Sequence, residues 1–363
     1  MFLRRYRRSQ KSAERADAVK RRVRLELERL RQILFGTLAI FLGLGLAALW
    51  LLSPGAALKA RFQPDECRRL ALTDPRTGQP IIGVEDLALA PNGDTLILSA
   101  HDRRADDAPG GGLYMMNLSA IRSDPPILLR LDAERGGSEV FRPHGIALDP
   151  ETGALAVINR YRVGAARVEV GQIGPTGWKP EWQIAAERLC RANDLSYRSE
   201  GLFVTLDRAD CGPSLRDLTP WTGTGAVAKL TPDAIIFETD GLSFANGIDG
   251  AAIAETRAKA IRMDKNTRIE LPGGPDNLTR DSSGALIAAV HPGLLRLFLM
   301  REGVFTRSGS RIVRLPPGGD VEVLFDDPGG DLISAATVGL MADDVLLMGS
   351  ATDSGILVCE KAR

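Results

Sequence analysis

Short apolar runs alternate with turn residues from about residue 67 onward, without a long amphipathic helical pattern. One phrase recurs six times in this region: polar residues, a short strand, a turn and an apolar strand. The copies begin at residues 83, 144, 193, 245, 275 and 336. Most of the steps between them match the roughly 40–60 residues of a four-stranded propeller blade. The pattern therefore predicts an all-β fold, a six-bladed β-propeller over residues 67–363.

Polar residues occupy the same point of each copy, which a pair of β-sandwiches, the alternative fold, does not explain. In a propeller the innermost strand of each blade faces the central axis, so these points converge. Carboxylate and amide oxygens are the ligands that calcium prefers, and Glu85 and Asp276 together would balance a divalent cation. The sequence thus predicts a site assembled on the axis from Glu85, Asp86, His144, Asn193, Asp194, Asn246, Asp276 and Asn277.

Each of the chain's three histidines lies beside one of these motifs. His144 occupies the first-strand position itself and is the candidate general base, because the pKa of imidazole lies near neutral pH. His291 is expected to line the mouth of the channel, whereas His101 fits a hydrogen-bonded structural histidine. The sequence has no Gly-x-Ser-x-Gly elbow, Walker loop or Rossmann fingerprint, which argues against a serine hydrolase and against nucleotide binding.

A run of 20 uncharged residues, Ile33–Leu52, precedes the β pattern. Its length as a helix matches a bilayer core of about 30 Å. Arginines at positions 24, 29 and 31 place the N-terminus in the cytoplasm by the positive-inside rule, and the body outside. The sequence therefore predicts a single-pass signal anchor. The alternative is a signal peptide cleaved within Ser53–Ala60, but its basic n-region and its apolar h-region would both be longer than is typical.

Composition supports a globular body with many turns: 44% of the 363 residues are hydrophobic, 25% are charged, and 38 are glycine. The formal net charge is zero, yet residues 1–32 carry 12 Lys/Arg against 4 Asp/Glu. This charge asymmetry favours targeting to a membrane over nucleic-acid binding. Apolar residues at helical spacing in this segment predict an amphipathic helix on the inner leaflet, with a coiled-coil homodimer as the alternative; they are Val19, Val23, Leu27, Leu30 and Leu34. Residues 53–66 are the predicted linker.

Four cysteines follow the apolar run, and none forms a Cys-x-x-Cys pair, which excludes a zinc ribbon or a thioredoxin-type site. Cys67 opens the β region and Cys359 nearly closes it. In an exported compartment this placement favours a disulfide between them over two buried thiols. Cys190 and Cys211 either form a second disulfide or stay free.

Together the motifs resemble those of the paraoxonase/arylesterase family of calcium-dependent lactonases, from Cys67 to Cys359. The matching segments are Gly83–Leu87 (GVEDL), Phe141–Ile146 (FRPHGI), Asn193-Asp194, Ala245–Ile248 (ANGI), Asp276-Asn277 and His291-Pro292. The resemblance implies a catalytic calcium held by Glu85, Asn193, Asn246, Asp276 and Asn277. It also implies a structural calcium held by Asp86, Asp194 and the backbone carbonyl of Ile146, and it matches the Cys67–Cys359 pairing.

The chain departs from the family at the second histidine of a proposed catalytic dyad, where it has Val157–Arg160 (VINR). The segment between Asn246 and Asp276 is also shorter than in the family. Gluconolactonase and strictosidine-synthase-like propellers share the architecture and are the neighbouring groups. The expected function is calcium-dependent hydrolysis of small-molecule lactones or aryl esters by an exported, membrane-anchored propeller. The alternative is a non-enzymatic, calcium-stabilised propeller that acts as an extracytoplasmic binding module.

Overall fold

The computed structural model describes residues 20–361 except 23–25, 28, 44, 46–51, 54, 105–109, 124–125, 135–139, 161–165, 209–210 and 213–222. The chain divides into two units, Met1–Ser53 and Pro54–Arg363. We describe each unit by itself.

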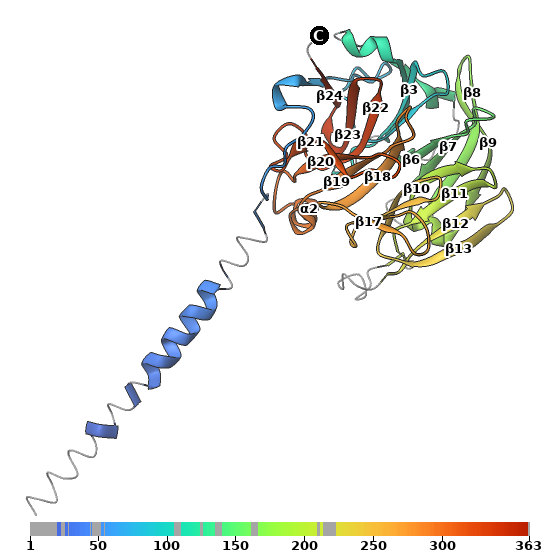
Figure 1. Cartoon of the computed structure of the whole chain (residues 1–363). Coiled ribbons are helices and arrows are strands. Elements are labelled where there is room, and N and C mark those ends of the chain that lie inside the picture. Colours follow the sequence, from blue (N-terminus) through green and yellow to red (C-terminus); the bar gives the residue numbers. More distant parts are fainter. Residues whose placement is uncertain are drawn as a thin grey trace, which may run out of the picture. The chain divides into compact units, whose positions relative to one another are not determined.

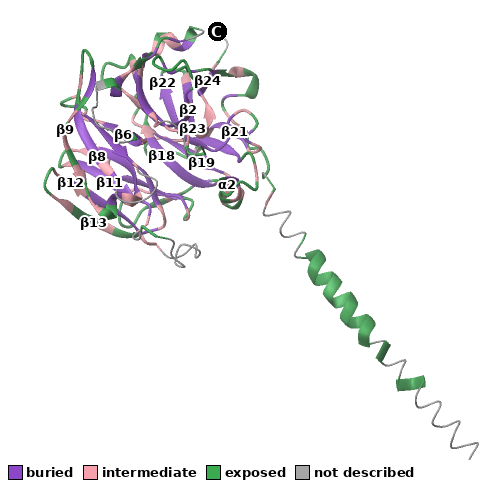
Figure 2. Cartoon of the chain, turned by 180° about the vertical axis from the view of Figure 1, so that it is seen from behind, coloured by how far each residue is buried: buried purple, intermediate pink, exposed green. Residues whose placement is uncertain are grey.

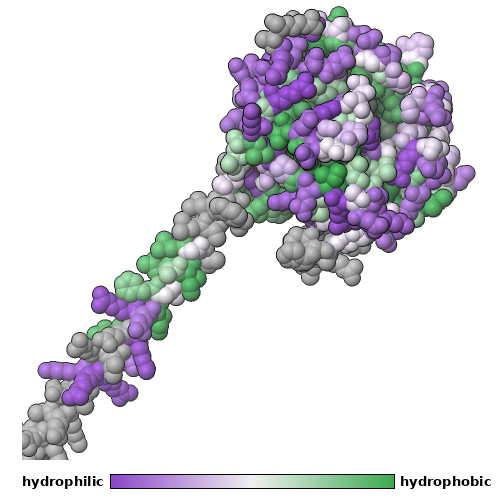
Figure 3. Space-filling model, in the orientation of Figure 1, coloured by the Kyte–Doolittle hydropathy of each residue, from purple (hydrophilic) through white to green (hydrophobic). Residues whose placement is uncertain are grey.

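The N-terminal unit is helical over residues 29–43, and Leu30 and Leu34 of this helix are exposed. Its apolar side chains form the hydrophobic stretch drawn in Figure 3. Within the described residues, no helix combines the length and the apolar character needed to cross a bilayer. The predicted span at 33–52 is therefore not found there. Residues 44 and 46–51 of that span, and Val19 and Val23 of the predicted amphipathic segment, lie outside the described residues.

The second unit is all-β, which confirms the predicted propeller class (Figure 1). Its described strands form four separate four-stranded sheets and one sheet of eight strands. The first four-stranded sheet consists of β6 (Pro143–Leu148), β7 (Leu155–Asn159), β8 (Arg167–Gly174) and β9 (Gly177–Ala185), and the second of β10 (Ala192–Arg198), β11 (Gly201–Leu206), β12 (Gly225–Leu230) and β13 (Ile235–Leu242). The third consists of β14 (Ala245–Asp249), β15 (Ala252–Glu255), β16 (Ala260–Arg262) and β17 (Arg268–Glu270). The fourth consists of β18 (Gly274–Arg280), β19 (Leu286–His291), β20 (Ser310–Leu315) and β21 (Glu322–Asp327).

The eight-stranded sheet corrects the prediction of six separate blades. Its strands are β1 (Cys67–Leu70), β2 (Ile82–Leu89), β3 (Thr95–Ala100), β4 (Gly112–Asn117), β5 (Leu129–Arg130), β22 (Ala336–Ala342), β23 (Val345–Ser354) and β24 (Ile356–Glu360). The run β2-β3-β4-β5 resembles one blade, and β22-β23-β24-β1 resembles another. They merge because the long strand β23 also pairs with β2, at Val84–Ser350 among other positions. The cause is an extra strand pairing that the repeat pattern does not record.

The first strand of each repeated phrase lies in an inner ring. β2 contacts β6, β6 contacts β10, and the series continues through β14, β18 and β22 back to β2. The inner strands β2, β6, β10, β14 and β18 each begin within three residues of the polar residues that the sequence pattern identified. Figure 2 shows these strands as mostly buried, whereas the outer strand β13 is mostly exposed or intermediate. The ring brings equivalent motifs from distant parts of the sequence together.

Two glycines let neighbouring inner strands approach closely. A Cβ on Gly145 would lie 2.5 Å from the carbonyl oxygen of Asn193, and one on Gly247 would lie 2.4 Å from that of Asp276. No side chain fits such a gap. The His-Gly-Ile and Asn-Gly-Ile motifs therefore have glycine because the strand that follows around the ring presses against that position.

Short helices connect the strands: η1 (Pro64–Glu66), η2 (Leu118–Arg122), η3 (Leu131–Glu134), η4 (Glu187–Arg191) and α2 (Leu294–Arg301). Cys67 and Cys359 are opposite each other in the β1–β24 pair and form a disulfide. Cys190 and Cys211 form a second one, so all four cysteines are paired. The predicted pairing of Cys67 with Cys359 is confirmed, and the open question of the other pair is answered.

Candidate metal centre on the propeller axis

The five residues expected to hold the first calcium are all buried at the inner ring, with none more than 7% exposed. Among the described residues, four of them keep a buried oxygen for which there is no hydrogen-bond donor: Glu85 Oε2, Asn193 Oδ1, Asn246 Oδ1 and Asn277 Oδ1. They come from four inner strands, β2, β10, β14 and β18. A buried acceptor without a donor costs about 1–3 kcal/mol. Four such oxygens in one ring require a common explanation.

Contacts around the ring link these residues. Asn277 donates from Nδ2 to the carbonyl oxygen of Glu85 over 3.0 Å, although 192 residues separate them in sequence. Nδ2 of Asn246 donates to Thr256 over 3.1 Å. The amide nitrogens of both asparagines are thus engaged while their oxygens are not. This division orients each amide with its oxygen free for another group.

Glu85 and Asp276 carry the negative charge of the site. Burial raises the pKa of Glu85 to about 6; the Arg103 guanidinium opposes that rise, and the nearby Asp276 carboxylate adds to it. Bringing two carboxylates together in a buried place disfavours their ionised forms. A cation beside them would remove that cost.

These donors fit a calcium ion, whose ligands are hard oxygens from carboxylates and amides. The site does not resemble one made from histidine, cysteine and acids alone. Within the described parts of the chain, no three such side chains are grouped closely enough to hold a metal. Any ion here therefore depends on the three asparagine oxygens. The four donor-free oxygens are the observation that favours it.

The residues expected at the second calcium serve another purpose in the structure. Asp86 Oδ2 accepts from the backbone N–H of Ile146 over 2.8 Å, and Asp194 Oδ2 accepts from that of Ile248 over 2.8 Å. Their Oδ1 atoms accept from the next residue in the chain. Each carboxylate thus joins its blade to the following one. Because all four oxygens have donors, the structure supports the second site less directly, and that site stays a prediction.

Burial nevertheless makes these two carboxylates costly to ionise. It raises the pKa of Asp86 to about 8, against the backbone donors at Ile146 and Leu87. It raises the pKa of Asp194 well above its ordinary value, and the charge of Asp86 adds to this rise. The two groups therefore lie close enough to repel each other.

His144 is buried beside Glu85, and arginines contact both of its ring nitrogens. Nδ1 lies 3.3 Å from Glu85 Oε1 and also contacts Arg103. Nε2 lies 2.8 Å from Nη1 of Arg160. Guanidinium only donates and a neutral imidazole has one acceptor nitrogen, so Arg103 and Arg160 cannot both donate to the ring. With Arg160 donating to Nε2, the proton is on Nδ1, toward Glu85, and Arg103 pairs with Glu85 instead. Burial and the two guanidiniums lower the pKa of His144 well below its ordinary value.

His291 presents a different arrangement. Its Nε2 lies 2.7 Å from Asp276 Oδ2, and its buried Nδ1 has no hydrogen-bond partner. The carboxylate fixes the proton on Nε2, which leaves the lone pair of Nδ1 unused. The sequence placed His291 at the channel mouth; the structure adds a bond from His291 to one of the predicted metal ligands.

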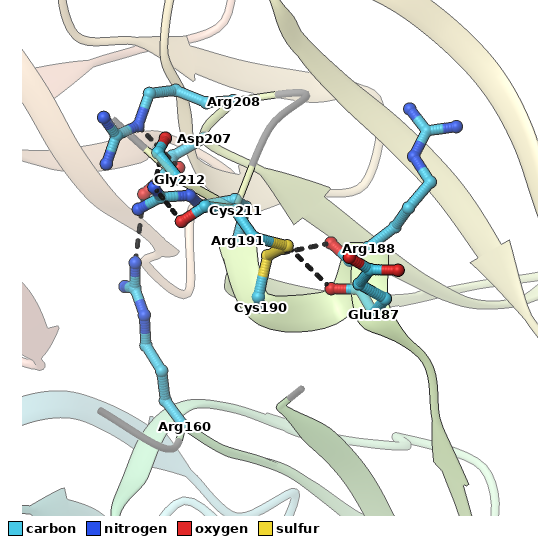
Figure 4. Close-up of a disulfide and its surroundings, with 9 residues drawn as sticks. All are labelled: Arg160, Glu187, Arg188, Cys190, Arg191, Asp207, Arg208, Cys211 and Gly212. Atoms are coloured by element: carbon cyan, nitrogen blue, oxygen red, sulfur yellow. Dashed lines mark hydrogen bonds and ion pairs between the residues drawn. A yellow bond between two sulfur atoms is a disulfide. The ribbon is translucent and has the colours of Figure 1, made fainter. Parts of the chain in front are cut away.

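The second disulfide supports this region through Asp207 (Figure 4). Cys211 bonds to Cys190 in η4, and Asp207 follows β11 just before Cys211. Asp207 Oδ2 accepts from Nη2 of Arg160 over 3.1 Å. The bridge therefore braces the segment whose carboxylate positions Arg160 against His144.

Sequence reasoning missed Arg103 and Arg160 as site residues. Both follow the second strand of a repeat, outside the polar motif at the first strand. Arg160 enters the sequence analysis only as the last residue of Val157–Arg160, the segment in which the second histidine of the family is absent. The one sequence feature that could have pointed to Arg103 is its position two residues after His101.

Comparisons with known proteins find no matching family model and no matching curated protein. Among solved structures, a gluconolactonase from Xanthomonas campestris is 14% identical with a TM-score of 0.48, covering 84% of this chain and 97% of that one. A calcium-binding protein, regucalcin from Agrobacterium tumefaciens, is 13% identical with a TM-score of 0.46, covering 77% and 90%. The first belongs to the group named above as a neighbour of the paraoxonases, and neither is described as a paraoxonase. These similarities assign no activity to this chain.

Proposed function

We propose that this protein is a calcium-dependent hydrolase of lactones or aryl esters. The observation that carries the proposal is the ring of four buried, donor-free oxygens with the carboxylates of Glu85 and Asp276. Glu85, Asn193, Asn246, Asp276 and Asn277 would hold the ion. Bound calcium would polarise a substrate carbonyl and stabilise the oxyanion that forms when water attacks.

The chain's own residues would position the ligands and accept the proton of the attacking water. Asn277 and Thr337 both donate to the carbonyl oxygen of Glu85, at 3.0 and 2.8 Å, and so fix its backbone. Two buried histidines are candidates for the proton acceptor. His144 needs Arg160 to leave its Nε2, whereas Nδ1 of His291 has no partner. The predicted role of His144 as the base stays a prediction beside this second candidate.

A non-enzymatic propeller that binds calcium only for rigidity is the competing function. Access to the site favours the enzyme. The side chains of Arg103 and Arg160 touch buried site residues, yet they are 32% and 24% exposed. Arg103 therefore leads from solvent to the candidate ligand Glu85, and Arg160 leads to His144. An ion used only for rigidity needs no such route.

The decisive experiment measures calcium binding by calorimetry and hydrolysis of phenyl acetate and δ-valerolactone on the purified protein, with calcium and with EDTA. Glu85→Gln removes a ligand charge, so we expect weaker calcium binding and loss of hydrolysis together. Glu255→Gln is the matched control, since Glu255 is also buried but pairs with Arg262 and Arg268. Full calcium affinity in Glu85→Gln would refute the metal site. Intact calcium binding without hydrolysis in the unaltered protein would favour the binding module.

The compartment follows from the disulfides, which are typical of oxidising environments outside the cytoplasm. We propose that the second unit functions there. Attachment to a membrane through residues 33–52 stays a prediction.

A further inference from the structure

Two guanidiniums lie against the candidate metal centre. Arg103 follows β3 and Arg160 follows β7, so they come from consecutive repeats. Nη2 of Arg103 lies 3.0 Å from Glu85 Oε1, and Arg160 binds the Nε2 of His144. Both side chains are partly exposed. A molecule that approaches Glu85 from solvent on this side therefore meets arginine first.

The charges here change when the proposed ion binds. Asp207 already pairs with Arg160 at 3.1 Å. The carboxylate that pairs with Arg103 is Glu85, which is itself a proposed calcium ligand. Bound calcium would neutralise the carboxylates of Glu85 and Asp276. The positive charge of Arg103 would then lie beside a cation and no longer be balanced by Glu85. A partly buried guanidinium in that position needs a new anion.

Other arginines make the surroundings more basic. The Nε of Arg142 is buried and has no hydrogen-bond partner. Arg301 is close enough to help lower the pKa of His144, and Arg142 acts likewise on His101. These guanidiniums add positive charge to the side of the site at which Arg103 and Arg160 lie.

We propose that the substrate carries an anionic group, a carboxylate or a phosphate, beside its ester or lactone bond, and that Arg103 and Arg160 bind this group. The guanidinium fork matches both anions in shape and charge. This inference rests on the proposed function and narrows its substrate class. Arg103 lies within reach of the metal ligand Glu85, so the anion would sit next to the carbonyl that reacts.

A charge series of aryl acetates tests the inference on the calcium-loaded full-length protein. The substrates are phenyl acetate, 4-carboxyphenyl acetate and 4-acetoxyphenyl phosphate. We expect a lower KM for one or both anionic esters, and the preferred one identifies the anion. Arg103→Gln should raise the KM of that ester about 10- to 100-fold, the range for a lost hydrogen bond to a charged group. The KM of phenyl acetate should rise by less than that of the anionic ester, so the ratio of the two KM values is the quantity that tests the inference.

A binding measurement separates this inference from hydrolysis. Calorimetry with 4-hydroxybenzoate, phenyl phosphate and phenol needs no turnover, and Arg103→Gln should weaken only the anions. Arg76→Gln, in an exposed turn, is the control for loss of one positive charge. If Arg103→Gln does not fold by circular dichroism, Arg103→Lys replaces it, because lysine keeps the charge but lacks the fork.

The outcomes are distinct. Anion binding that depends on Arg103 in a protein without hydrolysis would refute the proposed function and keep this inference. Hydrolysis with equal KM for neutral and anionic esters, unchanged in Arg103→Gln, would overturn the inference and keep the function. Calcium affinity that rises in Arg103→Gln without any loss of anion binding would also overturn it, since Arg103 would then only neutralise Glu85.

Discussion

A neutral histidine offers a single lone pair, and the two buried histidines at the axis use theirs differently. His144 gives its lone pair to Arg160, whereas that of His291 has no partner. We therefore expect His291→Gln to lower kcat for phenyl acetate by about 10²–10⁴-fold, the usual contribution of a general base. His144→Gln should cost less, and calorimetry should give both variants nearly the parent calcium affinity. The reverse order of losses would restore His144 as the base.

His101 predicts a pH dependence of stability. Burial, aided by Arg103 and Arg142, lowers its pKa to about 4, whereas the unfolded chain has the ordinary value near 6.5. Between these two pH values the unfolded chain holds the extra proton. The contribution of His101 to stability is therefore greatest above pH 6.5 and falls as the pH drops toward 4.

His101→Gln removes this titration, so its melting temperature should fall less than that of the parent over this range. Circular dichroism melts from pH 4 to 7 in EDTA would measure the difference, with the metal removed from both proteins. Parallel curves for the two proteins would contradict the low pKa.

At this scale the sequence predicted which polar residues meet at the inner ring, because each stands in a repeated phrase; their role as metal ligands stays a prediction. It could not predict how they are charged or paired. Arg103 reaches Glu85 from a neighbouring loop, and Thr337 reaches its carbonyl from 252 residues away. Such contacts depend on the closed ring, which no local pattern encodes.

Among the elements, neighbouring inner strands approach closely because glycine occupies two positions. Gly247→Ala would place a Cβ 2.4 Å from the carbonyl oxygen of Asp276. Because backbone must move to relieve this contact, we expect a loss of about 1–3 kcal/mol in unfolding free energy, as for other overpacked sites. Calcium affinity should fall as well, since Asp276 and Asn246 would shift.

Gly174→Ala is the matched control for that variant. It lies at the end of β8, where the nearest atom to an added Cβ is 3.7 Å away. Urea unfolding and calcium calorimetry on both variants check the prediction. Equal stability would mean that the inner strands can separate freely.

The sequence identified all six inner strands from their shared phrase. It also marked the segment between Asn246 and Asp276 as shorter than in the family it resembles, and β16 and β17 there have only three residues each. It did not foresee the merged sheet or helix α2. β23 has ten residues and is therefore long enough to pair with β2 beyond its own blade. The sequence did not predict this because an apolar run does not show where a strand ends.

For the whole molecule, the Cys67–Cys359 bridge spans 292 residues and fastens β1 to β24. We expect Cys67→Ser to lower the unfolding free energy by about 2–5 kcal/mol, because the open chain gains entropy when it unfolds. Thermal melts of the oxidised parent and the variant would measure this. Reduction with dithiothreitol should bring the parent toward the variant, and an unchanged melting temperature in both tests would show that the strand pairing alone closes the sheet.

The position of β1 beside β24 also sets an order of events during synthesis. Cys67 must wait as a free thiol until almost the entire chain has been made, whereas Cys190 meets Cys211 only 21 residues later. Four cysteines allow three pairings, and Cys67 is exposed to the wrong ones throughout that wait. Early oxidation of Cys190 and Cys211 removes both competitors. We therefore expect the short bridge to protect the long one, and oxidative folding to be most efficient when the inner pair forms first.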